Sequence, residues 1–91
     1  MHTIFKQRLD ICDKQVVEMP EGASILHIDR QDGQPCIWYE CDTDMPTTKV
    51  TILCFGTGYC MDDAPAMEHI GTVQIDGYVW HYYRKLPGFI D

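Results

Sequence analysis

The stretch HIGTVQI-DG-YVWHYYRK, residues 69–85, decides the fold of this chain. The Asp-Gly pair in its middle separates two runs rich in β-branched and aromatic residues. Asp and Gly tolerate the positive φ angles of a two-residue hairpin turn. A turn of that length places Val73 opposite Trp80 on one face, and Thr72 opposite His81 on the other. The stretch therefore predicts two antiparallel strands with one apolar face.

A second Asp-Gly pair divides SILHIDRQ-DG-QPCIWYEC, residues 24–41, in the same way. With a two-residue turn, Leu26 lies opposite Tyr39 on the apolar face, and His27 lies beside Trp38 on the other face. An aromatic ring on the less apolar face of a sheet is available to anchor a protein partner. We therefore expect a second hairpin, and we expect Trp38 to contribute to partner binding.

Three further segments have strand character: residues 3–11, 15–19 and 49–55. The last of these is apolar on both faces, which is typical of a central strand. Residues 61–68 read as a loop with at most one helical turn. The chain is thus predicted to form one all-β domain, residues 1–91, as a small antiparallel sandwich or open barrel with little helix.

The net charge is −7, and the acids are concentrated in the middle of the chain. Between residues 9 and 76 there are thirteen acidic and three basic side chains, whereas the two ends together carry a net +3. Nucleic-acid binding depends on neutralising phosphates with Lys and Arg. This distribution therefore argues against direct nucleic-acid binding and permits a basic protein partner.

The five cysteines are expected to be reduced thiols, most of them in the core, because their number is odd and no export signal is apparent. Cys36 and Cys41 are an odd number of positions apart in a predicted strand, so their side chains point to opposite faces and cannot chelate together. No apolar run is long enough to span a membrane. We expect no metal, no cofactor, no membrane contact and a cytoplasmic location.

No residue pattern indicates catalysis. Ser24 is the single serine, and it is not part of a G-x-S-x-G motif. The segment FGTGY, residues 55–59, resembles a phosphate loop only in composition, because no helix is predicted after it. The sequence therefore predicts a protein that is not an enzyme.

Four phrases carry a resemblance to a known family: residues 9–26, 31–42, 55–58 and 69–83. In this order and spacing they resemble a family of small bacteriophage- or prophage-encoded proteins of unknown function. The resemblance implies a place in the bacterial host cytoplasm and, as for many small acidic phage proteins, a role in binding and blocking host factors, including defence proteins. The family offers no catalytic residues. This chain departs from it at Tyr59, where the family more often has His.

The leading hypothesis is a non-enzymatic phage accessory protein that binds a host or phage protein. The residues expected to contact the partner are the loop acids and one tryptophan: Asp42, Asp44, Asp62, Asp63, Glu68 and Trp38. One alternative is a homo-oligomeric structural or scaffolding protein, such as a homodimer, paired through the first strand or residues 78–85 as sheet edges. Another is an acidic mimic of nucleic acid.

Overall fold

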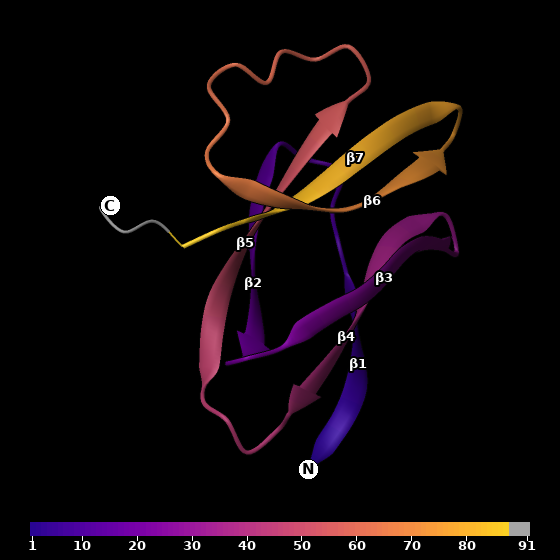
Figure 1. The fold of residues 1–91 in the computed structure, drawn as a ribbon. Coiled ribbons are helices and arrows are strands. Elements are labelled where there is room, and N and C mark those ends of the chain that lie inside the picture. The colour runs from indigo at the N-terminus through magenta and orange to yellow at the C-terminus, as the bar shows by residue number, and fades with distance from the viewer. Residues whose placement is uncertain (88–91) are drawn as a thin grey trace.

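The computed structural model describes residues 1–87, and these residues form seven β-strands and no helix (Figure 1). The strands are β1 (His2–Arg8), β2 (Lys14–Pro20), β3 (Ser24–Gln31), β4 (Gln34–Asp42), β5 (Thr47–Gly56), β6 (Met67–Ile75) and β7 (Tyr78–Lys85). The predicted all-β class is confirmed. Within residues 1–87 no helix exists that could cross a membrane.

The strands form two antiparallel sheets that do not close into a barrel. The three-stranded sheet has the order β1-β4-β3, and the four-stranded sheet has the order β2-β5-β7-β6. The two sheets meet where β3 runs beside β6, and β2 also packs against β4 (Figure 1). The core lies between the sheets, so each sheet has one face turned away from it.

Both Asp-Gly pairs form the predicted turns. The φ angles are 52° and 76° at Asp32 and Gly33, and 53° and 84° at Asp76 and Gly77. Positive φ at both central residues is the requirement of a type I′ turn, whose twist matches that of the strands it joins. The turns thereby fix the register of two of the sheet ladders.

The second hairpin has the predicted register, since Val73 pairs with Trp80 and Thr72 with His81. In the first hairpin His27 pairs with Trp38 as predicted, but Leu26 does not pair with Tyr39. A β-bulge between Ile25 and His27 shifts the register, so Ile25 takes the place opposite Tyr39. Leu26 is left without a partner and is 51 % exposed, because a bulge adds one residue to one strand only.

Among the described residues, the largest fully buried side chains are those of Leu9, Met19, Pro35, Ile37, Ile52 and Tyr82. They come from both sheets and from the segment after β1. Such burial contributes roughly 1.5–3 kcal/mol for each large apolar side chain. Side chains of both sheets therefore pack together to form one hydrophobic core.

Other expectations need correction. The predicted first strand ends early, because β1 stops at Arg8 and Ile11 is 43 % exposed. Residues 61–66 form a loop as expected, but Met67 and Glu68 belong to strand β6. β1 is a sheet edge as expected, but β7 is central, because β5 and β6 pair on its two sides. The chain leaves the sheet after Lys85, the last residue of β7, and residues 88–91 lie outside the described range.

Candidate functional site

Trp38 lies in the middle strand of the three-stranded sheet, on the face turned away from the core. Its neighbours Ile37 and Tyr39 are 0 % and 6 % exposed. Successive strand residues point to opposite faces. Cross-strand pairing places Lys6 on one side of Trp38 and His27 on the other. The sequence prediction that Trp38 is on the less apolar face is confirmed.

Exposed apolar side chains lie beside this tryptophan. Ile4 shares the face of Lys6, two residues away on β1, and is 55 % exposed. Leu26, at the bulge of β3, is 51 % exposed. We call this surface the Trp38 face, and it consists of Ile4, Lys6, Leu26, His27, Trp38 and Glu40.

Charged groups of both signs surround the Trp38 face. His2 Nε2 lies 3.3 Å from a carboxylate oxygen of Glu40, and His27 Nε2 lies 3.6 Å from one of Asp29. The imidazole of His27 is also stacked at a tilt near Trp38, with ring centroids 6.2 Å apart. The face thus combines apolar side chains (Ile4, Leu26 and Trp38) with polar ones, since Lys6 and His27 lie directly beside Trp38. Binding surfaces commonly mix the two kinds.

Asp42 and Asp44 lie at the end of β4, beyond the Trp38 face. The amino group of Met1 lies 3.2 Å from a carboxylate oxygen of each. The backbone N–H of Asp44 donates to Asp42 Oδ1 at 3.0 Å. That bond, followed by the bond from the amino group of Met1, lowers the pKa of Asp42 from its ordinary value. Asp42 is therefore held in its ionised form.

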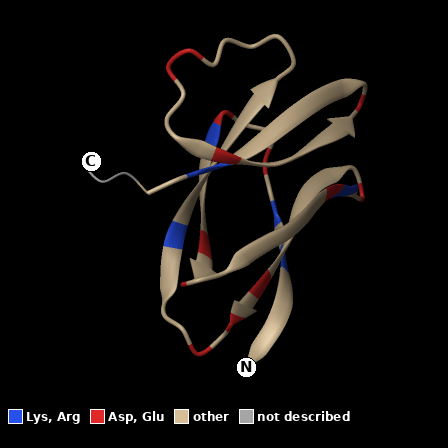
Figure 2. Cartoon of the chain, in the orientation of Figure 1, with Lys and Arg blue, Asp and Glu red and all other residues tan. Residues whose placement is uncertain are grey.

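The structure does not bring the other predicted acids to this place. Asp62 and Asp63 lie in the loop between β5 and β6, and Glu68 lies on β6 opposite Arg84. Figure 2 shows the loop acids and the β4–β5 turn acids at opposite ends of the molecule. The five acids thus fall in three separate places, which local sequence could not reveal because loop positions depend on the packing of the strands.

A second group of side chains, on the outer face of the four-stranded sheet, was not chosen from the sequence. His81 makes hydrogen-bond contacts through both ring nitrogens, Nε2 with the Thr57 hydroxyl at 2.8 Å and Nδ1 with the Thr72 hydroxyl at 2.9 Å. Tyr83 packs beside His69, with ring centroids 5.0 Å apart. The alternation of residues along the β6–β7 hairpin already predicted that Thr72, His81 and Tyr83 share one face, and this pattern could have identified the group.

The core also contains ionisable groups, namely cysteine thiols and a tyrosine hydroxyl. Three cysteines are buried, as expected, and burial raises the pKa of the Cys54 thiol above its ordinary value. Burial likewise raises the pKa of the Tyr82 hydroxyl, which donates to the carbonyl of Asp10 at 3.0 Å. Within the described residues, no three His, Cys, Asp or Glu side chains are placed to hold a metal ion.

The fold and this surface define a small two-sheet antiparallel β domain with an outward-facing tryptophan. The chain belongs to a family described as a domain of unknown function, DUF7352, which matches residues 1–88. No curated protein and no solved structure matches the chain.

Proposed function

We propose that this domain acts by binding another protein through the Trp38 face, and that it does not catalyse a reaction. The observation that carries the proposal is an outward, half-buried tryptophan on a central strand, on the same face as two side chains, Ile4 and Leu26, that are more than half exposed. Tryptophan is among the residues that most often dominate binding energy at protein interfaces.

The rigidity of the surface supports this role. Trp38 is held by strands on both sides, so little conformational freedom remains for it to lose when a partner binds. The charged border, including Asp42 and Asp44 beyond the end of the face, would steer a partner and make association depend on salt. Asp62 and Asp63 lie in the loop between β5 and β6, and Glu68 lies on β6 in the other sheet, so none of them is part of the Trp38 face.

The setting of this activity is part of the proposal. The resemblance to small phage or prophage proteins supports an accessory role in the bacterial host cytoplasm, where the partner is a host or phage protein. Blocking a host defence factor is the form of this role that the resemblance favours. We do not extend the proposal to mimicry of nucleic acid, because the five acids lie in three separate places.

A homodimer is the second candidate, and one observation favours it. β1 is the edge of its sheet, and it exposes Ile4 by 55 % and Phe5 by 41 %. An edge strand carries unpaired backbone groups that can pair with a second copy. Sedimentation equilibrium decides this candidate: a dimer that Ile4→Glu dissociates supports it, and a monomer at high concentration dismisses it.

The main proposal is tested by co-purification from bacterial lysate, with the bound protein identified by mass spectrometry. Trp38→Ala should weaken capture by more than tenfold, as expected of a central interface residue. The matched control is Tyr78→Ala, which removes an aromatic ring that is 66 % exposed on the other sheet. Circular dichroism verifies that both variants fold. Equal capture by the two variants would overturn the proposal.

A further inference from the structure

Strand β5 extends beyond its neighbour β7, so that among residues 1–87 part of β5 is paired on one side only. The ladder with β2 continues as far as Thr47, opposite Pro20. The ladder with β7 ends where Ile52 pairs with Arg84. We call residues 47–51 of β5 the open edge.

Two features of the chain after β7 keep the edge open. The backbone N–H of Leu86 donates to the carbonyl of Ala66 at 2.9 Å, so the end of β7 follows β6 and diverges from β5. The next residue, Pro87, has no N–H to donate to a ladder. Within the described residues, the chain that follows β7 therefore does not cover the open edge.

The direction of the backbone groups follows from one hydrogen bond. Cys54 N–H donates to the carbonyl of Asp13 at 3.0 Å, on the side of β2. Backbone groups of successive strand residues alternate in direction, so even-numbered residues of β5 face β2 and odd-numbered residues face the other way. The N–H and C=O of Lys49 therefore face the open side.

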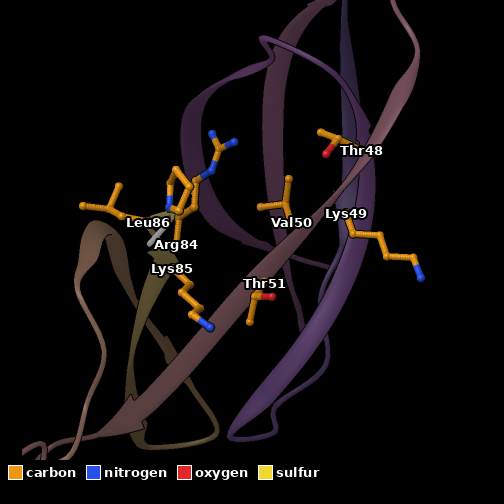
Figure 3. A pocket seen from close by; sticks show the side chains of 8 residues that line it. Thr48, Lys49, Val50, Thr51, Arg84, Lys85 and Leu86 are labelled. Atoms are coloured by element: carbon orange, nitrogen blue, oxygen red, sulfur yellow. The ribbon is translucent and has the colours of Figure 1, made fainter. Parts of the chain in front are cut away.

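A hollow of about 320 Å³ lies along the open edge, lined by residues 48–51 and 84–87. Figure 3 shows Val50 and Thr51 on one side of it, with Arg84 and Lys85 on the other. The ammonium group of Lys49 extends from the far side of β5. The hollow thus combines an unpaired stretch of main chain with basic side chains.

The basic character of this place is unusual for the molecule. Three of the seven Lys and Arg residues line the hollow in a chain with a net charge of −7. Among residues 1–87, every ion pair within 4 Å involves a histidine or the N-terminal amino group. Glu18 and Glu68 lie opposite Lys49 and Arg84 in the ladders, yet neither forms such a pair. Lys49 and Lys85 are therefore available to an incoming ligand, whereas Arg84 Nη1 already donates to the carbonyl of Ala23 at 3.4 Å.

We propose that the open edge binds an extended acidic segment of a partner protein, which adds to β5 as a further strand in the line that β7 leaves. Main-chain hydrogen bonds to Lys49 would supply affinity, as in other cases of strand addition. Carboxylates on alternate residues of the segment would lie on the face of the sheet that Lys49 and Lys85 share. This site is separate from the Trp38 face, and either can be correct without the other.

The test is a titration of the ¹⁵N-labelled chain with the peptide acetyl-Val-Asp-Val-Glu-Val-Asp-amide, followed by NMR. The largest shift changes are expected at the amides of residues 47–51. Lys85→Gln and Lys49→Gln should each weaken binding about threefold, while the control Lys14→Gln, on β2 and outside the hollow, should not. Of two peptides N-methylated at complementary alternate positions, one should lose binding and the other retain it, because only alternate N–H groups of an added strand face β5.

Several results would overturn this proposal. Equal binding by both N-methylated peptides would exclude strand addition, and shifts centred on β1 would place the peptide at another edge. Unchanged affinity in the two glutamine variants would exclude recognition of the acidic groups by the hollow. Concentration-dependent shifts at Lys49 without peptide would assign the edge to a second copy of the chain.

Discussion

Gly71 is the position at which the contact between the two sheets is most easily perturbed. It lies in β6, beside Ile28 of β3 in the other sheet. A Cβ atom built on Gly71 lies 3.8 Å from the Ile28 Cβ and overlaps its Cγ2 methyl, well inside the 3.0 Å that real Cβ atoms keep. The Gly71→Ala variant must therefore push β3 and β6 apart or force Ile28 from its position.

The expected magnitude follows from two opposing effects. Forcing one extra methyl group into a packed core costs about 1–3 kcal/mol. Replacing a strand glycine by alanine restricts the unfolded chain and returns roughly 0.4–1 kcal/mol. The free energy of unfolding should thus fall by about 1–2 kcal/mol. For a chain of this size the melting temperature should fall by about 5–15 °C.

Urea unfolding, followed by tryptophan fluorescence, measures this loss. Ile28→Leu removes the branch at Cβ at a cost below about 1.5 kcal/mol, so Gly71→Ala should be about 1 kcal/mol less harmful in that background. Gln74→Ala, at an exposed position of the same strand, is the control and should change stability by less than about 0.5 kcal/mol. A neutral Gly71→Ala, or an equal loss in both backgrounds, would refute the proposed contact.

Three further predictions concern ionisable groups. Because the folded pKa of Asp42 is lowered, its contribution to stability is present above the ordinary value of 3.8 and is lost as pH falls through the folded pKa; Asp42→Asn should therefore be less stable than the natural chain at pH 7, with the difference closing in acid, and a constant difference would contradict this. Tyr82→Phe leaves the carbonyl of Asp10 without its donor and should cost about 1–1.5 kcal/mol in urea unfolding; no measurable loss would show that the bond is not formed. Iodoacetamide at pH 8 should alkylate the two exposed cysteines well before Cys54, because burial shields that thiol and raises its pKa; peptide mapping that finds equal rates would contradict its burial.

Local turn chemistry made much of the fold predictable. The Asp-Gly pairs specify type I′ turns, and once the turn length is known the pairing of Val73 with Trp80 and of His27 with Trp38 follows by counting. The outward position of Trp38 was available from the same count. These features depend on residues close together in the chain.

Features that depend on distant segments were not predictable in the same way. The apolar residues before the bulge fit two registers of the first hairpin, one with Leu26 opposite Tyr39 and one with Ile25 opposite Tyr39. The sequence pattern alone does not distinguish them. The central place of β7 depends on β5, which lies more than twenty residues earlier in the chain. The open edge of β5 depends on the point near Pro87 at which the chain after β7 diverges from β5. Glu68 was predicted to lie in a loop, but strand β6 already begins at Met67.

Photo-crosslinking in bacterial cells tests the central claim, contact through the Trp38 face, most directly. The photoreactive residue p-benzoylphenylalanine replaces Leu26 on that face or, as a control, Tyr78 on the other sheet; these side chains are 51 % and 66 % exposed. The account predicts a light-dependent adduct with one protein from position 26, lost when Trp38→Ala is added, and no such adduct from position 78. The same adducts from both positions, or an adduct from position 26 that Trp38→Ala leaves unchanged, would contradict it.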